Sequence, residues 1–255
     1  MSNGSARETP RWASRTVQLL FLMALLALWY GLTTWGQVSP ILLPNPLAVL
    51  HELYLVLSTG EFIGDLLTTL SELAFAFSIA MILGTVTGYL ISRSGYLTAV
   101  LEPLLAGIYS IPIILFLPLY SLLFGLGPAS KIALGATISF FPIALNTIAG
   151  FANVEPIYVG SARSMGASNY QLFRYVLVPA ALPVILTGLR MGFTVALLAI
   201  LGSEVLASLS GIGHKIAELD EKMDRAPMFA YIAFAVVIAA VLNSIVSGLE
   251  GRARR

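Results

Sequence analysis

The stretch LLTTLSELAFAFSIAMILGTVTGYLI, residues Leu66–Ile91, is apolar along its whole length except for a single charge at Glu72. A helix needs about 20 predominantly apolar residues to cross the hydrocarbon core of a bilayer. This stretch therefore predicts a membrane-spanning helix. Gly84 and Gly88 are one helical turn apart, so they share a face on which a second helix can approach closely.

The composition of the whole chain has the same character. Of its 255 residues, 58% are apolar and 11% are charged, whereas soluble domains have roughly 45–50% and about 25%. The mean hydropathy is +0.89. We therefore expect an all-α integral membrane protein. Six spans would use roughly 120 to 150 residues, so neither a fused ATPase nor a fused ligand-binding domain is expected.

Gaps between charged residues locate the expected spans. The six ranges are about Thr16–Trp35, Leu66–Ile91, Leu104–Phe124, Ile132–Phe151, Leu182–Leu206 and Phe229–Leu249. Pro112 and Pro118 lie within the third range and are expected to kink it. Such a kink serves either as a packing device or as a gate, and the sequence leaves both interpretations open.

Lysine and arginine are distributed unequally between the two sides that these spans define. One side holds Arg7, Arg11, Arg15, Arg93, Arg163, Arg174, Arg252, Arg254 and Arg255; the other holds Lys131, Lys215, Lys222 and Arg225 among several acids. Cytoplasmic loops carry the excess of cations. Both termini are therefore expected in the cytoplasm, which agrees with an even number of spans.

Signatures of chemical catalysis fail when the residues are inspected. The chain has no cysteine, and His51-Glu52 is followed at the fifth position by Leu55 rather than the histidine of a zinc protease. Gly166-Ala167-Ser168-Asn169 has the form of a rhomboid nucleophile without a membrane histidine to activate it. No Gly-Lys pair exists, so a Walker A loop is absent. We expect no enzymatic activity, metal site or cofactor, and no nucleic-acid partner.

The connection between the fourth and fifth spans, residues 152–181, is longer than two neighbouring helices require. Asn153 or Glu155 is suited to cap a helix over Ile157–Met165 that ends at Gly166. A capping box from Ser168 to Gln171 predicts a second helix that ends near Val178, with Pro179 and Pro183 turning the chain into the fifth span. The pair is either a knob that fits a partner's groove or an amphipathic hairpin on the lipid headgroups.

The sequence of this connection resembles a known family. Gly160-Ser161-Ala162-Arg163-Ser164-Met165-Gly166, followed by Val176-Leu177-Val178-Pro179, is similar to the loop motif of ABC importer permeases. Leu43-Pro44-Asn45-Pro46, Phe141-Pro142-Ile143, Leu182–Arg190 and Ser210-Gly211-Ile212-Gly213 resemble further elements of the nitrate/sulfonate/taurine branch. The motif's leading glutamate is Gly160 here, and its first alanine is Ser161.

The resemblance implies a type I permease fold and a set of partners. It implies a multi-pass inner-membrane subunit that pairs with a second copy as a homodimer, with two cytoplasmic ATPase subunits and with an extracytoplasmic substrate-binding protein. Residues 1–15 and 251–255 would be cytoplasmic tails, and 16–250 the transmembrane domain with a coupling loop at 153–179. The expected ATPase contacts are Gly160, Ser161, Ala162, Arg163, Met165, Gly166 and Pro179.

Candidates for the translocation path are the polar, aromatic and kinked positions inside the spans. They are Tyr109, Pro112, Phe116, Arg190 and Glu204. Arg190 is expected to line the path, to be neutralised by a neighbouring subunit, or to snorkel to the interface. Glu72 and Glu204 lie near the outer ends of their spans, where we expect solvated carboxylates.

The solute itself is left open by the sequence. Organic acids, sulfonates or taurine, nitrate and vitamin precursors all fit the branch. The aromatic side chains of the third and fourth spans favour an organic solute, although they also serve helix packing. An ion-coupled secondary transporter without an ATPase is the alternative function; it would require an internal repeat and midplane ion ligands.

Overall fold

The computed structural model describes residues 11–36 and 38–253, and its regular structure there is helical, as predicted. In chain order the helices are α1 (Arg11–Thr34), α2 (Pro46–Thr59), α3 (Phe62–Ser92), α4 (Gly95–Tyr109), η1 (Ile113–Phe116), α5 (Leu117–Phe124), α6 (Pro128–Ala152), α7 (Pro156–Ser164), α8 (Asn169–Leu172), the π-helix η2 (Phe173–Leu177), α9 (Val178–Leu206), α10 (Ile212–Glu221) and α11 (Arg225–Ala253). The predicted tail residues 1–10 and 254–255 lie outside the described residues, as do Arg7, Arg254 and Arg255.

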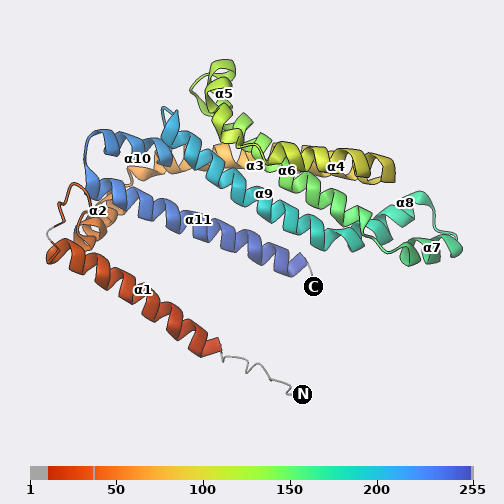
Figure 1. Cartoon of the computed structure of the whole chain (residues 1–255), viewed down its shortest axis with the longest axis horizontal. Helices are drawn as coiled ribbons and strands as arrows, with labels where there is room; N and C mark the ends of the chain where they lie inside the picture. Colours follow the sequence, from red (N-terminus) through yellow and green to blue (C-terminus); the bar gives the residue numbers. More distant parts are fainter. Residues whose placement is uncertain (1–10, 37, 254–255) are drawn as a thin grey trace.

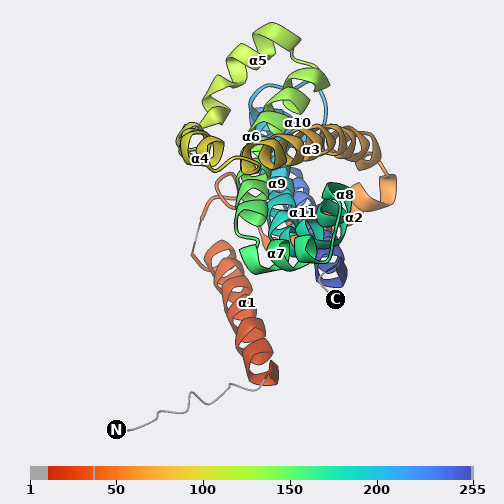
Figure 2. The ribbon, with the colours of Figure 1, turned by 90° about the vertical axis from the view of Figure 1, so that its right-hand side faces the viewer.

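Helix α6 is the centre of the molecule and packs along both α3 and α9 (Figures 1 and 2). A Cβ atom built on Gly84 of α3 would lie 2.9 Å from Ile143 Cβ of α6, and one on Gly88 would lie 2.6 Å from Thr147 Cβ. The predicted small-residue face of Leu66–Ile91 is thus confirmed as the contact with α6.

Helix α9 approaches the other side of α6 through a second pair of glycines. A Cβ on Gly188 would lie 2.5 Å from Asn146 Cβ, and one on Gly192 would lie 2.5 Å from Ile143 Cγ1. Any side chain larger than hydrogen at these positions would push the helices apart. Close backbone approach is therefore what holds the three helices together, as is usual where lipid removes the hydrophobic drive for association.

The bundle has two ends that differ in structure. We call the end with α10 and the start of α3 the α10 end, and the end with α7 and the end of α3 the α7 end (Figure 1). The contacts of Gly84 and Gly88 show that α3 and α6 run in the same direction, from the α10 end to the α7 end. Helix α9 runs the opposite way, because Gly188 contacts Asn146 and the later Gly192 contacts Ile143.

Five helices of the described chain are long and apolar enough to cross a membrane, and a broken pair adds a further candidate. The kink expected at Pro112 within Leu104–Phe124 is present as a full break: α4 begins earlier than expected, at Gly95, ends at Tyr109, and is bent by 70° from the following segment Ile113–Phe124. Pro112 lies in the break. Pro118 is in the first turn of α5, where a missing N–H costs no hydrogen bond, so it starts a helix instead of kinking one.

The segment before the fifth predicted span also differs from expectation. Pro179 and Pro183 do not turn the chain, since helical structure continues from Asn169 to Leu206. The π-turn at Phe173–Leu177 directly precedes Pro179. A π-turn changes the hydrogen-bond register, and this accommodates a residue that has no N–H to donate. Span five is therefore longer than predicted, and the second loop helix is its extension.

Two shorter helices, α2 and α10, were not predicted. Val56 of α2, Ile212 and Leu219 of α10, and Tyr231 and Phe234 of α11 form a buried cluster at the α10 end. Asn45 caps α2 by accepting a hydrogen bond from Leu47 N–H, and Pro46 occupies its first turn. Asn-Pro before an apolar run is a helix-start signal that identifies α2 from sequence.

Helix α1 stands apart from the other helices (Figures 1 and 2). Its apolar side chains are exposed over most of its length. Trp29 anchors its end to the rest of the chain: Nε1 donates to Pro44 O at 3.1 Å, and the ring lies 6.2 Å from that of Phe229.

Candidate functional site

The connection at the α7 end is a compact projection with well-defined ends. Helix α7 begins after Glu155, whose side chain makes no capping bond. After α7, Gly166 has φ +80°, its N–H donates to Arg163 O at 2.9 Å, and Ala167 N–H donates to Ala162 O at 3.0 Å. The predicted termination at Gly166 is confirmed. The predicted capping box is also present: Gln171 N–H donates to Ser168 Oγ, and Ser168 N–H donates to Gln171 Oε1.

Several of the predicted coupling residues meet in one groove. A cavity of about 510 Å³ lies between α7 and the start of α9, and it is lined by Tyr158, Ser161, Ala162, Met165, Tyr175, Val176, Pro179 and Ala180. Pro179, distant in sequence, is thus brought beside Ser161, Ala162 and Met165. Gly160, Arg163 and Gly166 are not part of this lining. Ala162 is buried, while Met165 is 81% exposed.

Three large side chains at α7 remain exposed within the described residues. Ile157, Tyr158 and Met165 are all exposed. Beneath them, Phe173 of the π-turn packs against Tyr89 of α3, with ring centroids 5.0 Å apart, and against Phe151 of α6 at 6.3 Å. The projection is therefore rigid underneath and apolar on its surface, as a docking element must be.

Glu204 does not lie where we expected it. Its side chain is 0% exposed. It accepts hydrogen bonds from Thr69 Oγ1 at 2.7 Å and from Gly213 N–H at 2.8 Å. Glu72 is 1% exposed, so the expectation of solvated carboxylates at both positions is wrong. The physical reason is α10, which folds back over the ends of α3 and α9 and excludes water.

Lys131 completes a buried charged cluster with these two carboxylates. It is fully buried at the start of α6. Its Nζ donates to Leu126 O and to Gly127 O, and it interacts electrostatically with Glu72 and Glu204. The sequence analysis assigned Lys131 to an external loop because it directly precedes the expected fourth span. Its place inside the fold depends on packing that periodicity does not report.

Exposed charges surround the buried cluster on the surface of α10. Glu218 accepts hydrogen bonds from Lys222 and from Lys215, the latter at 2.9 Å. The hydrogen bond from Lys222 and then that from Lys215 lower the pKa of Glu218 to about 2. These side chains are partly exposed, so the ion pairs stabilise α10 only modestly.

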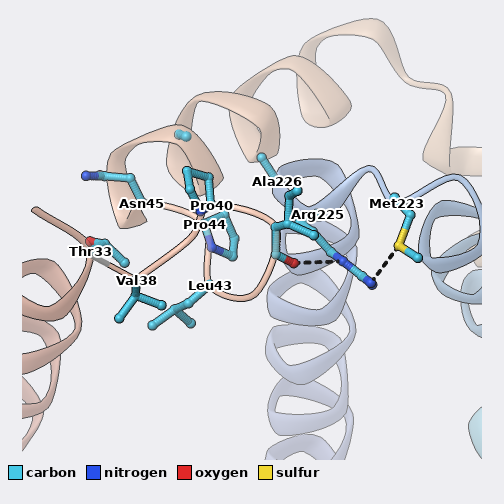
Figure 3. A pocket seen from close by; sticks show the side chains of 11 residues that line it. Thr33, Val38, Pro40, Leu43, Pro44, Asn45, Met223, Arg225 and Ala226 are labelled. Atoms are coloured by element: carbon cyan, nitrogen blue, oxygen red, sulfur yellow. Dashed lines mark hydrogen bonds between the residues drawn. The ribbon is translucent and has the colours of Figure 1, made fainter. Parts of the chain in front are cut away.

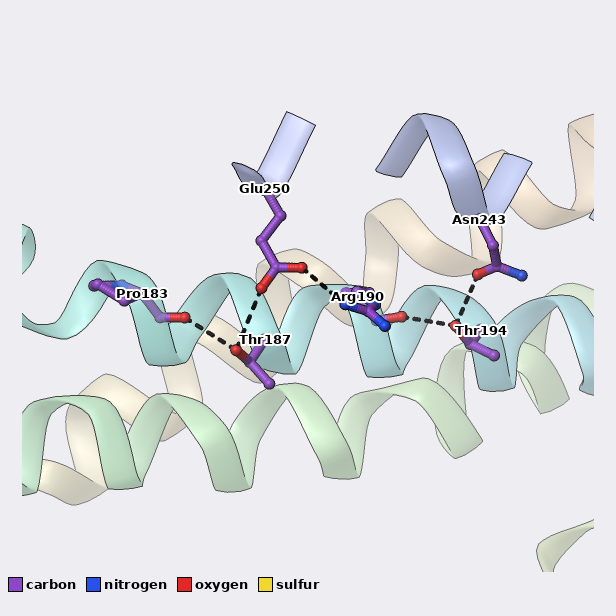
Figure 4. A network of polar contacts seen from close by, with 6 residues as sticks. All are labelled: Pro183, Thr187, Arg190, Thr194, Asn243 and Glu250. Atoms are coloured by element: carbon purple, nitrogen blue, oxygen red, sulfur yellow. Dashed lines mark hydrogen bonds and ion pairs between the residues drawn. The ribbon is translucent and has the colours of Figure 1, made fainter. Parts of the chain in front are cut away.

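Arg190 lies in a different environment, on a polar face between α9 and α11 (Figure 4). Its Nη1 is 3.4 Å from Glu250 Oε2, and its side chain is 55% exposed. On the same face Thr194 donates to Asn243 Oδ1 at 2.9 Å. The partner of Arg190 is therefore in its own chain. Sequence reasoning missed this partner because Glu250 lies just beyond the expected sixth span and hydropathy does not report which distant side chains pair.

A cavity of about 390 Å³ opens beside this polar face. It is lined by Thr187, Arg190, Met191, Thr194 and Val195. Asn146 of α6 reaches its edge, with Nδ2 3.9 Å from Met191 Sδ. A half-exposed guanidinium next to hydroxyl and amide groups is suited to bind a small anion or a polar organic solute.

The candidates at the broken helix are spread along it. Tyr109 ends α4 and stacks on Phe141 of α6 with centroids 5.8 Å apart, Pro112 lies in the break, and Phe116 is part-exposed. An apolar groove of about 630 Å³ lies between the broken segment and the end of α9; its lining includes Leu115, Leu122 and Leu206. The structure thus does not bring Tyr109 and Phe116 into the cavity beside Arg190.

A further cavity of about 360 Å³ lies at the α10 end, between the end of α1, the 38–48 segment and the start of α11 (Figure 3). Arg225 Nε donates to Ile41 O at 3.1 Å across it. Met223, the only non-glycine residue with positive φ in the described chain, has its sulfur 3.0 Å from Arg225 Nη2. None of the predicted site residues lines this cavity. Within the described chain, no group of three or more potential metal ligands is found.

The fold matches that of transmembrane subunits of ABC transporters. The structure of the MetNI methionine ABC transporter in an inward-facing form aligns with a TM-score of 0.63, covering 75% of this chain and 95% of that chain at 18% sequence identity. At this identity the likeness concerns the fold alone. The fold and its long apolar helices are those of a multi-pass membrane protein.

The sequence comparisons identify the family. The family model of the binding-protein-dependent transport system inner membrane component matches residues 76–255. The chain is 31% identical to the taurine transport system permease protein TauC of Escherichia coli over 97% of this chain and 93% of that protein. It is also 31% identical to the putative aliphatic sulfonates transport permease protein SsuC of Bacillus subtilis, over 91% and 84%. The chain belongs to this family.

Membership confirms the resemblance noted in the sequence and the function inferred from it. The protein is a multi-pass permease subunit of an ABC importer, of the taurine/sulfonate branch, and a transport component instead of an enzyme. The alternative of an ion-coupled secondary transporter is not favoured by these relatives. ABC importer permeases work with ATPase and substrate-binding partners.

Proposed function

We propose that this permease forms the path for a small organic anion, that it crosses the membrane six times, and that α7 receives the ATPase. The observation that carries the proposal is the contrast between the exposed apolar surface of α7 and the half-exposed Arg190 on the polar face between α9 and α11. The first suits a protein partner, and the second suits a passing anion.

The direction of the helices supports six crossings. Helix α3 ends at the α7 end, and α6 starts at the α10 end. The intervening α4, η1 and α5 must therefore lead from one end to the other, which makes the 70° break a feature of a crossing segment. With α1, α3, α6, α9 and α11 this gives six crossings and places both termini on one side.

Charge supports an orientation with the α7 end in the cytoplasm. Arg93, Arg163 and Arg174 belong to the α7 end, whereas Glu218, Asp220, Glu221 and Asp224 gather at the α10 end. The excess of cations marks the cytoplasmic side. A cytoplasmic α7 is accessible to the ATPase, and an external α10 end is accessible to the binding protein.

The residues at α7 divide into those that contact the ATPase and those that shape the helix. We assign contact to Met165 and Arg163 on the projecting surface and support to Ser161, Ala162 and Pro179 in the groove behind it. Gly160 has open space around its Cβ position, so the glycine leaves room for the partner. Gly166 sets the exit from α7 through its positive φ.

The solute path would run along the face of α6 and α9 that carries Arg190. Thr187, Thr194 and Asn146 supply further polar groups on this face. Tyr109, Pro112 and Phe116 of the broken segment would form the entrance. We assign Glu204 to the fold instead of the path, because no part of its side chain is exposed. Since the cavity opens at the surface of one chain, a second copy of the permease would close it.

Reconstitution tests the proposal. The purified chain, in proteoliposomes with its ATPase subunits and binding protein, should import a radiolabelled small sulfonate in an ATP-dependent manner. The chain alone should neither hydrolyse ATP nor import in response to ion gradients. Uptake by the chain alone would contradict the ABC mechanism, and ATP-dependent uptake of only uncharged solutes would contradict the anion assignment.

Single cysteines test the topology, because the natural chain has none. A membrane-impermeant thiol reagent added outside intact cells should label Asp220→Cys and Glu61→Cys, and should not label Ser168→Cys. Labelling of Ser168→Cys from outside would reverse the orientation and remove α7 from the cytoplasm. Crosslinking in native membranes should give dimers; monomers alone, with the ATPase present, would contradict the pairing.

A further inference from the structure

Each of two chain connections at the α10 end is held by a buried charged side chain. The α5–α6 connection is held by Lys131, whose Nζ donates to Leu126 O and to Gly127 O, the latter at 3.0 Å. The α9–α10 connection is held by Glu204, whose Oε2 accepts from Gly213 N–H at 2.8 Å. Neither charged side chain is exposed to solvent, so both sets of hydrogen bonds lie inside the protein.

The start of α10 is capped entirely by side chains from other helices. Gly211 N–H donates to Asp65 Oδ1 at 3.3 Å, Ile212 N–H to Thr69 Oγ1 at 3.0 Å, and Gly213 N–H to Glu204. Because these N–H groups have no partner within α10, the side chains of α3 and α9 determine where α10 lies. A Cβ on Gly211 would overlap the Glu204 carboxyl group, and one on Gly213 would lie 2.6 Å from Glu204 Cβ, so the start of α10 packs directly on this side chain.

Glu72 lies between the two anchors. It is 1% exposed, and neither of its carboxyl oxygens accepts a hydrogen bond from an N–H or hydroxyl group. One helical turn away, a Cβ on Gly135 of α6 would lie 3.2 Å from Ala76 Cβ of α3 and 3.0 Å from Ile200 Cδ1 of α9. Glu72, Lys131 and Glu204 are each one turn from these contacts in the direction of the α10 end, so the three buried side chains gather at the junction of α3, α6 and α9. There Lys131 attracts both carboxyl groups, and the carboxyl groups of Glu72 and Glu204 also contact each other.

We propose that Lys131, Glu72 and Glu204 join the α5–α6 and α9–α10 connections into one rigid unit, which couples the position of the broken segment α5 to that of α10. A movement of α10 would displace Glu204. Because Glu204 and Lys131 belong to one charged cluster, Lys131 and the end of α5 would move with it. The three are positioning residues, since they face the interior of the chain and no solute reaches them.

The consequence for transport rests on the proposed orientation. With the α10 end outside, a binding protein that touches α10 would also control the broken segment, whose groove reaches Leu206 at the end of α9. The rigid unit would then move as one piece when the path opens. The distance measurements below do not depend on that orientation, so the failure of uptake and the failure of this inference are distinguishable.

Spin labels test the rigid unit. Leu122 of α5 is 82% exposed and Leu209 of the α9–α10 connection is 70% exposed, and the chain has no native cysteine. A chain labelled at Leu122→Cys and Leu209→Cys would be assembled with its ATPase and excess unlabelled permease. We expect one narrow distance distribution, unchanged by a non-hydrolysable ATP analogue. A distribution that shifts or splits with nucleotide would overturn the proposal.

Variants of the cluster give the second readout. Glu204→Gln and Lys131→Met should each broaden the distribution, whereas Glu221→Gln, an exposed carboxylate on α10, should leave it narrow. If both cluster variants accumulate and keep it narrow, the proposal is wrong.

If the single variants accumulate too poorly for distance measurements, a double variant tests the electrostatic link through the amount of protein in the membrane. Lys131→Met leaves two buried carboxyl groups without a cation, and adding Glu72→Gln removes one of them. The double variant should accumulate several-fold better than Lys131→Met alone. Equal accumulation would mean that Lys131 acts only through the Leu126 and Gly127 carbonyls, which would overturn the electrostatic link.

Discussion

The chain connections at the two ends of this permease are held in different ways. At the α10 end the chain turns are tied by buried groups, with Glu204, Thr69 and Lys131 satisfying backbone donors and acceptors inside the fold. At the α7 end the turn is tied only by its own backbone and a capping box, and apolar side chains point outward. Charge inside the bundle therefore indicates structure here, and apolar surface outside it indicates a partner.

The largest effect on stability is expected at the α10 end. Glu204→Ala would leave Gly213 N–H and Thr69 Oγ1 inside the fold without their acceptor. Each buried donor that loses its partner costs about 1–3 kcal/mol, and two together are a large part of the stability of a protein domain. Membrane abundance and the thermal unfolding midpoint in detergent should both fall sharply. Glu221→Ala, the exposed control at the same end, should change neither; equal losses in the two variants would contradict the distinction.

A variant at the α7 end should lose ATPase binding while the permease still folds. Gly166 has φ +80°, which costs a residue with a Cβ about 1–2 kcal/mol. Gly166→Val should misdirect the end of α7 and reduce co-purification of the ATPase, while membrane abundance stays normal. Gly95→Val is the matched control, because the Cβ position there is equally open and φ is ordinary. Normal ATPase binding by Gly166→Val would show that the exit angle of α7 is unimportant.

Arg190 allows the same distinction to be tested on the face between α9 and α11. Its side chain is 55% exposed, whereas that of Glu250 is 9% exposed. Arg190→Gln would therefore leave a mostly buried carboxylate without its cation and should cost about 1–3 kcal/mol of stability. If Arg190 binds the solute, the apparent KM for uptake should rise about tenfold, equivalent to about 1.4 kcal/mol of binding energy. Arg190→Lys keeps the charge, so its apparent KM should lie between that of the natural chain and that of Arg190→Gln. A normal KM in Arg190→Gln would leave this arginine with a packing role only.

The smallest effect concerns the surface of α10. Glu218 has its pKa lowered to about 2 from an ordinary value of 4.5, so the stability it contributes is present above pH 4.5 and is lost as the pH falls toward 2. Glu218→Gln should lower the unfolding temperature slightly at pH 6 and have no effect near pH 2. A difference that is the same at both pH values would mean that the carboxylate is not the cause.

Much of the α7 end was predictable because its signals are local. Ser168 and Gln171 specify a capping box, Gly166 specifies a helix end, and the structure has both. The bend at Pro112 was predicted as a kink, whereas Pro118 was misread because a proline signals a helix start as well as a kink. Pro179 and Pro183 were misread because a π-turn has no sequence signature.

The α10 end was less predictable because its contacts join distant residues. Glu204 meets Thr69 across 135 positions, and hydropathy reports neither the partner nor the burial. The expectation of solvated carboxylates followed from their place near span ends. It failed because α10 covers them, and α10 itself is amphipathic and too short to register as a span. The pairing of Arg190 with Glu250 was out of reach for the same reason.

The central claim is that exposed apolar surface at α7, and not exposed apolar surface in general, engages the ATPase. Met165→Asp and Leu209→Asp place the same charge on highly exposed residues at the two ends, 81% and 70% exposed respectively. Co-purification of the ATPase with each variant, from membranes with equal permease abundance, measures the claim directly. We predict that Met165→Asp loses the ATPase and that Leu209→Asp retains it. Full ATPase recovery with Met165→Asp would contradict the account.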